Sequence, residues 1–308
     1  MAEITAAQVK ELREKTGAGM MDCKKALTEA GGDFEEAVKV LRKKGLAAAG
    51  RKAGRVTSEG LAWAEVSEGS AVAVEINSET DFVAQNAEFR ELVVTIAGIA
   101  ARSKAGSVDQ LVDEKWPGDP ENRTVAQILA EKIAKIGENL SVRRFIRYEA
   151  TPKSVFGTYV HGNGRIAVVV ELHAEGGDRD ALGSLARDLA MHVAAAEPRF
   201  LRREEITEAD LTTEREIARD QALKSGKPEN VVEKIVSGKM EKFYGEAVLL
   251  EQPYIREEKT SIRQLVEQRA GQAGAKAELA RFARFKVGEG LERRSDDFVA
   301  EVMAQARG

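Results

Sequence analysis

A pattern of strand, turn, strand and helix occurs twice along this chain and constrains its fold more than any other feature. In the first copy, two runs of alternating apolar residues, 61–66 and 71–76, surround the turn Glu68–Ser70. Such runs on either side of a short glycine-containing turn are typical of a β-hairpin. A helix from near Asn86 through Ile99 follows. We therefore expect a β-hairpin and then a helix in this part of the chain.

The second copy of the pattern lies about a hundred residues further along. Here the strands are expected at 157–161 and 165–172, around the turn Gly162–Gly164, and a helix follows again. When Val74–Ile76 is placed over Val170–Leu172, hairpin aligns with hairpin and helix with helix. We interpret this agreement as an internal duplication that gives two related α+β subdomains.

Three short helices are expected before the first hairpin. Thr5 and Gln8 have the spacing of a capping box at the start of the first helix. Glycines at Gly17–Gly19 and Gly31–Gly32 separate the three helical patterns. The basic, glycine-containing segment Gly50–Gly54 is expected to be a linker. The sequence thus predicts a small N-terminal three-helix domain.

The predicted fold class is α+β, with that helical domain, the duplicated core, a helical hairpin and a small C-terminal helical module. A short break at Ser225–Pro228 between two helical segments favours an antiparallel hairpin. Further elements are expected as a helix at 124–136, strands at 142–148 and 282–287, and a last helix from Asp296. The expected domains are 1–54, 55–150, 151–290 with the hairpin at about 202–245, and 291–308.

The composition is that of a globular protein without a strongly basic character: 43% of residues are hydrophobic, 32% are charged and the net charge is -4. Proteins that mainly grip a phosphate backbone usually have a basic domain, so direct nucleic-acid binding is not expected. The single cysteine, Cys23, is expected to be a buried, inert thiol in a reducing compartment. No signal-peptide pattern and no apolar run of about 20 residues occurs, so we expect a cytoplasmic protein without a membrane partner.

The residue patterns of common catalytic and metal sites are missing. None of the three histidines, His161, His173 and His192, has another histidine or a cysteine at metal-ligand spacing. The nucleophile elbow, the phosphate-binding loop and the dinucleotide-binding fingerprint are also missing. We therefore expect no catalysis, no cofactor and no bound metal.

The best candidate for a binding site is the segment Thr80–Asp81–Phe82–Val83, directly after the second strand of the first hairpin. A single phenylalanine among polar residues at this place has two explanations. In one, Phe82 folds into the core and staples the following helix. In the other, Phe82 is an aromatic wedge that projects from a rigid scaffold beside the carboxylate of Asp81. The residues alone favour the two explanations equally.

Met20 and Met21 form a second candidate. Adjacent residues of a helix cannot both face the same core, so at least one of them should be exposed. An exposed methionine has a flexible thioether that adapts to a partner surface. We therefore expect a protein contact in this part of the helical domain.

At these residues the sequence resembles translation elongation factor Ts, the guanine-nucleotide exchange factor of elongation factor Tu. The resemblance covers essentially the whole chain, and the order of its segments makes it specific. The segments are Thr16–Leu27 (TGAGMMDCKKAL), Thr80–Val83, Ile136–Asn139 with Arg143–Arg144, His161–Gly162, Met191–Ala195, Ser225–Pro228 and Phe285–Gly290.

The resemblance implies a ubiquitin-associated-like N-terminal domain, a two-part core and a hairpin that can form a homodimer. It also implies that Asp81 and Phe82, within the exchange motif Thr80–Val83, intrude beside the partner's nucleotide pocket. There they would displace the bound magnesium ion and weaken GDP binding. The implied partner-binding residues are Arg13, Met20, Met21, Lys24, Ile136, Gly137 and His161.

Two other functions remain as alternatives. The protein can be a plain adaptor, in which the N-terminal helices hold a peptide or a ubiquitin-like ligand and the core is a spacer. It can also be an RNA-binding translation protein, although its net charge of -4 counts against this. An adaptor does not need an acidic and aromatic wedge in its core. The segment around Phe82 therefore distinguishes the adaptor hypothesis from the exchange-factor hypothesis.

Overall fold

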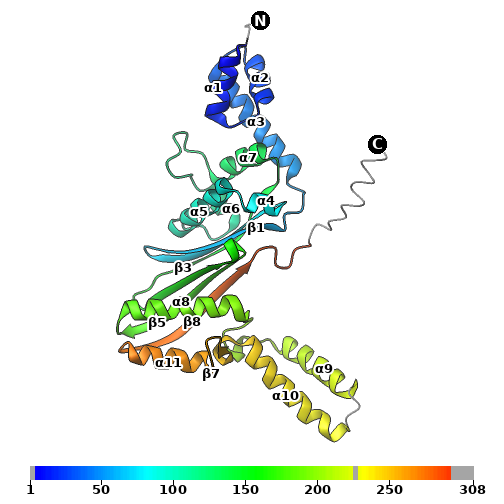
Figure 1. The fold of residues 1–308 in the computed structure, drawn as a ribbon, viewed down its shortest axis with the longest axis vertical. Helices are drawn as coiled ribbons and strands as arrows, with labels where there is room; N and C mark the ends of the chain where they lie inside the picture. The colour runs from blue at the N-terminus through cyan, green and yellow to red at the C-terminus, as the bar shows by residue number, and fades with distance from the viewer. Residues whose placement is uncertain (1–3, 225–227, 293–308) are drawn as a thin grey trace. The chain divides into compact units, whose positions relative to one another are not determined.

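The computed structural model describes residues 4–224 and 228–292 and has a mixed α and β architecture (Figure 1). Contacts divide the chain into two units. The first comprises 1–62, 74–145 and 286–308, and the second comprises 63–73 and 146–285. The four domains expected from the sequence stay a prediction. The expected last helix from Asp296 and most of the C-terminal module lie outside the described residues.

The N-terminal helices form a small bundle with its own core. The helices are α1 (Ala6–Thr16), α2 (Met20–Glu29) and α3 (Phe34–Lys52). The predicted capping box is confirmed, because the Thr5 hydroxyl accepts from the Gln8 N–H and the Gln8 side chain accepts from the Thr5 N–H. Leu12, Cys23 and Leu27 are fully buried in the bundle core, and this burial raises the pKa of the Cys23 thiol.

The predicted linker at Gly50–Gly54 is wrong for its first three residues, because α3 continues through Gly50 to Lys52, and only Ala53 and Gly54 follow the helix. Packing against α7 (Val125–Ile136) explains the longer helix. Gly45 is buried at this contact, where an added Cβ would be in ordinary van der Waals contact with the Cβ of Ala134, at 3.7 Å. The Lys52 ammonium also donates to the carbonyl of Ile133. Tertiary contacts therefore override the local preference of glycine for a linker.

The first sheet has the strand order β1-β2-β3 and contains the first predicted hairpin. Its strands are β1 (Glu59–Ser67), β2 (Ser70–Ser78) and β3 (Leu140–Glu149), and every residue of β2 is buried. Helices α4 (Asp81–Ala84), α5 (Ala87–Arg102), α6 (Val108–Asp113) and α7 connect β2 to β3. The buried face of α5 explains the apolar pattern from Phe89 to Ile99.

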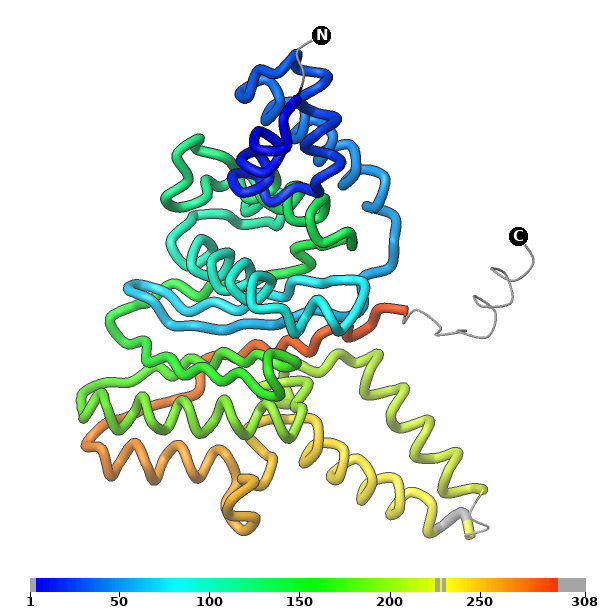
Figure 2. The backbone as a smooth tube through the Cα atoms, turned by 45° about the horizontal axis from the view of Figure 1, so that its top comes forward, coloured from blue at the N-terminus to red at the C-terminus, as the bar shows by residue number. Residues whose placement is uncertain are grey.

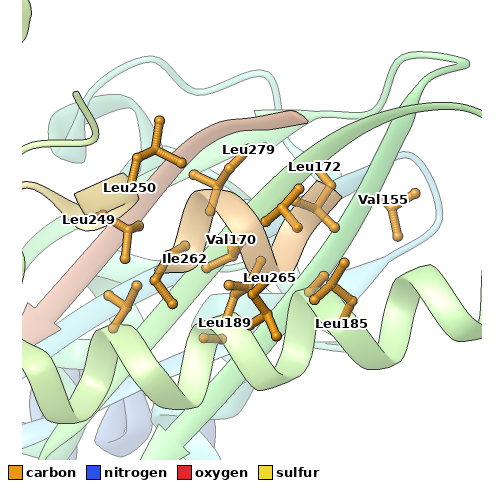
Figure 3. Packing of buried hydrophobic residues seen from close by; sticks show 14 of the residues in the cluster. Val155, Val170, Leu172, Leu185, Leu189, Leu249, Leu250, Ile262, Leu265 and Leu279 are labelled. Atoms are coloured by element: carbon orange, nitrogen blue, oxygen red, sulfur yellow. The ribbon is translucent and has the colours of Figure 1, made fainter. Parts of the chain in front are cut away.

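The second sheet has the order β4-β5-β8, with β4 (Ser154–His161), β5 (Ile166–Gly176) and β8 (Ala275–Lys286). Strands β4 and β5 are antiparallel, with Gly157 opposite Val170 and His161 opposite Ile166. Helices α8 (Arg179–Ala196) and α11 (Ile262–Gln272) lie on the same side of this sheet (Figure 1). Figure 3 shows how leucines and valines from the helices and strands meet to form the core of the second unit.

The predicted helical hairpin is present as α9 (Glu208–Lys224) and α10 (Glu229–Ala247). The two helices lie side by side and antiparallel in Figure 2. Ala218, Ala222, Val232, Val236 and Met240 form their small core. The remaining elements are the 3₁₀ turns Gly162–Gly164, Arg203–Glu205 and Leu249–Glu251, and the two-stranded sheet of β6 (Pro253–Tyr254) and β7 (Glu257–Ser261).

Candidate functional site

The segment after β2 forms a single helical turn that projects Phe82 into solvent. In α4, Val83 and Ala84 are buried, whereas the side chain of Phe82 is 81% exposed. No other large apolar side chain is as exposed in the part of the chain that the structure describes. The core-staple explanation of Phe82 is therefore wrong, and the other explanation requires this exposure.

Local sequence explains why the chain turns here. Thr80 is extended and begins the turn, and the N–H of Gln85 closes it on the carbonyls of Asp81 and Phe82. Asn86 then caps α5 by accepting from the Glu88 N–H. This cap starts α5 as a helix separate from the short turn of α4. Val83 and Ala84 occupy the buried side of the turn, and Phe82 lies on its outer side.

Two glutamates hold the turn to the segment that follows α7. The Glu138 carboxylate accepts from the Thr80 N–H at 3.0 Å and from the Thr80 hydroxyl at 2.6 Å. In the other direction, the Glu79 carboxylate accepts from the Asn139 N–H at 2.6 Å and from Arg55 at 3.3 Å. We refer to the bonds among Glu79, Thr80, Glu138 and Asn139 as the turn clamp. It joins two segments about 58 residues apart.

A buried carboxylate supports the strand that leads to the turn. The side chain of Glu75 on β2 is fully buried and accepts from Arg143 at 2.8 Å and from Arg144 at 2.6 Å, both on β3. It also accepts from the backbone N–H of Gly288 at 2.8 Å. Gly288 has a φ of +72°, and an added Cβ would lie 2.2 Å from the carbonyl oxygen of Ser58, so only glycine fits. These bonds offset the cost of burying the charge.

The electrostatics beside the turn are set by the start of α5. The Glu88 carboxylate accepts from Lys132 and from Lys135, and it lies 2.9 Å from Lys135. These hydrogen bonds, with Lys132 first, hold the pKa of Glu88 below its usual range. No described side chain pairs with the Asp81 carboxylate, which stays available to a partner.

The structure brings two predicted partner-binding positions next to the turn clamp. Ile136 is the last residue of α7, and Gly137 ends that helix in the left-handed region with a φ of +89°. Gly137 is exposed and Ile136 is half-buried. Gly137 directly precedes Glu138 and Ile136 comes just before Gly137, so the clamp ties their backbone to the Phe82 turn. Sequence reasoning missed this link, because a bond between residues about 58 positions apart leaves no local pattern around Glu79 or Glu138.

The other predicted positions lie elsewhere. Met20 and Met21, at the start of α2, are 59% and 64% exposed, which confirms that at least one faces outward. Arg13 on α1 and Lys24 on α2 are exposed too. His161 belongs to the second unit, at the end of β4, where its Nδ1 lies 3.0 Å from the Tyr159 hydroxyl. The contact role of all these residues stays a prediction.

A hollow of about 580 Å³ lies between the N-terminal bundle and α7. Its lining includes Lys15, Arg42, Gly45, Arg123 and Ala134, but none of the predicted site residues. Within residues 4–224 and 228–292 no group of three histidine, cysteine or acidic side chains is placed to hold a metal ion. In the same residues no helix combines the length and the apolar character needed to cross a bilayer. The candidate site is thus a projection and not a pocket.

Comparison with known proteins places the sequence in one family. The family described as Elongation factor TS matches residues 79–289. Proteins named Elongation factor Ts are 48% identical in Syntrophotalea carbinolica, over 99% of this chain and 100% of theirs, and 47% identical in Trichlorobacter lovleyi, over 98% of each. One from Clostridium novyi is 49% identical over 98% of each chain. This chain therefore belongs to the elongation factor Ts family.

Proposed function

We propose that this protein is the guanine-nucleotide exchange factor of elongation factor Tu. It binds the GDP form of that partner, displaces magnesium and promotes GDP release during translation elongation. The observation that carries the proposal is the 81% exposed ring of Phe82, held beside Asp81 on a clamped turn. An exposed aromatic on a rigid support is typical of a residue that anchors a protein interface.

Exchange of this kind needs no bond to be made or broken in the exchange factor. The protein must bind its partner with and without nucleotide, while its binding opposes that of GDP. By linkage, the factor lost from GDP affinity is also lost from the affinity of the exchange factor when GDP is present. Magnesium is a sensitive target, because this small cation demands near-ideal octahedral geometry. Movement of a few magnesium ligands in the partner is sufficient.

Other parts of the proposal follow from the same role. The protein acts as a binding factor in the cytoplasm, without catalysis of its own and without direct contact to nucleic acid or membrane. Arg13, Met20, Met21 and Lys24 hold the partner from the N-terminal bundle, while Ile136, Gly137 and His161 contact it from the rest of the chain. The helical hairpin of α9 and α10 provides a surface for a homodimer.

The test is release of fluorescent GDP from purified elongation factor Tu, with the wild-type protein and with Phe82→Ala. We expect the wild-type protein to accelerate release at micromolar concentration and Phe82→Ala to lose most of this acceleration. Because Phe82 is exposed, the variant should unfold at the same denaturant concentration as the wild type.

A matched control is Gln85→Ala, which removes an exposed polar side chain from the same turn and should leave exchange almost unchanged. Lack of acceleration by the wild-type protein would refute the proposed function. Full exchange by an Asp81→Ala, Phe82→Ala double variant would refute the role of the turn.

A further inference from the structure

The turn that carries Phe82 is too short to hold its own shape. Helix α4 has four residues, and isolated helices shorter than about 12 residues are marginal in water. Val83 and Ala84 anchor its inner side, but Phe82 itself is 81% exposed. The backbone from which the ring projects must therefore be held by bonds from outside the turn. The hydrogen bonds of the turn clamp are such bonds.

Glu138 is the central member of this clamp. Its two carboxylate oxygens accept one bond each, from the hydroxyl of Thr80 at 2.6 Å and from its N–H at 3.0 Å. Bonds to a charged acceptor are roughly twice as strong as those between neutral groups. Thr80 precedes Asp81 and Phe82 directly, so the carboxylate fixes the backbone from which both side chains project.

Glu138 also follows the end of α7, where Gly137 turns the chain in the left-handed region. The reciprocal bond from the Asn139 N–H to Glu79, at 2.6 Å, prevents the two segments from sliding past each other. The half-buried position of Glu138 strengthens its bonds, because fewer water molecules compete for the carboxylate.

We propose that Glu138 is a positioning residue for nucleotide exchange, which acts by holding the Thr80–Phe82 turn in its active orientation. The inference rests on the proposed function. If the ring is already held in place before the two proteins meet, less conformational entropy is lost when it enters the partner. Glu138 therefore raises the rate of the exchange step, while the affinity for the partner comes from other contacts.

The experiment measures GDP release at increasing concentrations of Glu138→Ala, Phe82→Ala and the variant with both changes. We expect Glu138→Ala to lower the maximal rate about tenfold, which corresponds to about 1.4 kcal/mol. The concentration that gives half of this rate should stay within about twofold of the wild-type value. In the Phe82→Ala background, Glu138→Ala should have no further effect, because residues that act through one another are not additive.

Conservative variants separate positioning from a general structural effect. Glu138→Gln keeps one of the two oxygens that accept from Thr80 and should recover part of the rate. Thr80→Val removes only the hydroxyl donor and keeps the N–H, so it should slow exchange less than Glu138→Ala. If Glu138→Ala does not fold, Thr80→Val replaces it in the test. Glu131→Ala is the matched control, since it removes another half-buried, ion-paired glutamate of α7.

Three outcomes would overturn the inference while the wild-type protein still exchanges. They are a wild-type rate of Glu138→Ala at every concentration, a raised half-saturating concentration with an unchanged maximal rate, and full additivity with Phe82→Ala. The second would make Glu138 a direct partner contact. Absence of exchange by the wild-type protein would overturn both this inference and the proposed function.

Discussion

The two hairpin-and-helix halves of the protein bury a glutamate at the same place in their pattern. Glu75 on β2 and Glu171 on β5 occupy matching positions when the halves are aligned, and both side chains are fully buried. Glu75 is held by two arginines of β3, whereas Glu171 is held by Arg281 of β8 at 2.5 Å and by the Ser154 hydroxyl at 2.5 Å. The shared framework thus uses different partners in each half.

The connection from strand to helix differs more. After β2 the chain makes the clamped turn with Phe82 before α5 begins. From Gly176, the last residue of β5, it passes through Gly177 directly to Asp178, which caps α8 by accepting from the N–H of Asp180 at 2.9 Å. The repeated hairpin and helix, with their buried glutamates, stabilise both halves. The candidate site lies on the Phe82 turn, which is an addition to the first half. Changes to the framework and to the turn should therefore affect different measurements.

The largest expected effect comes from the two buried glutamates. We expect Glu75→Ala to lower the free energy of unfolding by about 3–5 kcal/mol, the usual cost of breaking a buried ion pair. Glu171→Ala should lower the free energy of unfolding less than Glu75→Ala does. Its partner Arg281 is 46% exposed, so water can solvate the guanidinium once the carboxylate is gone, whereas Arg143 and Arg144 are only 21% and 31% exposed. Urea denaturation measures both.

The control for this pair is Glu175→Ala, because Glu175 has an exposed ion pair with Lys153 and its loss should not be measurable. An equal or larger loss in Glu171→Ala than in Glu75→Ala would contradict the proposed difference between the halves.

An intermediate effect is expected where α8 approaches β4. A Cβ added to Gly157 would lie 2.1 Å from the backbone carbon of Ala186, so Gly157→Ala must push helix and strand apart. We expect a loss of about 1–3 kcal/mol in the free energy of unfolding, as for other overpacked cores. Gly183 on the same helix has open space around it, and Gly183→Ala should stabilise the protein by about 0.5–1 kcal/mol. Thermal unfolding measures both variants: a lower midpoint temperature for Gly157→Ala and a higher one for Gly183→Ala would support this expectation. An equal loss in both would contradict it.

A smaller, pH-dependent effect is expected in the second unit, which contains all three histidines. Nε2 of buried His192 bonds to the side-chain oxygen of Gln252 at 2.9 Å, and its Nδ1 accepts from the Ile255 N–H at 3.4 Å. Burial lowers the pKa of His192, so its protonation favours the unfolded state. Stability should therefore be highest above pH about 6.5 and fall below it by at most about 1.4 kcal/mol per pH unit.

Denaturation between pH 7 and pH 5.5 checks this expectation. The slope should be smaller in His192→Gln than in the wild-type protein, even though the variant is less stable at pH 7. An unchanged slope in the variant would assign the acid sensitivity to other groups.

Much of the fold could be predicted from local patterns. The two hairpins, the capping box at Thr5, the start of a helix near Asn86 and the helical hairpin follow from signals that lie within a few residues of each other. Gly50 misled the prediction, because the packing of α3 on α7 outweighs the helix-breaking tendency of one glycine. The turn clamp was beyond prediction, since Glu138 meets Thr80 across 58 residues and nothing within either segment indicates that the two are in contact.

The sequence by itself determined the repeated hairpin-and-helix order, the family and the position of the candidate segment at Thr80–Val83. It determined these because periodicity, turn residues and motif order are all written along the chain. Only the tertiary structure decided whether Phe82 is in the core or in solvent. That choice depends on Val83 and Ala84 filling the inner side of the turn and on Glu138 holding Thr80 from a distant segment. A residue's exposure is set by what packs around it, and those neighbours come from the whole fold.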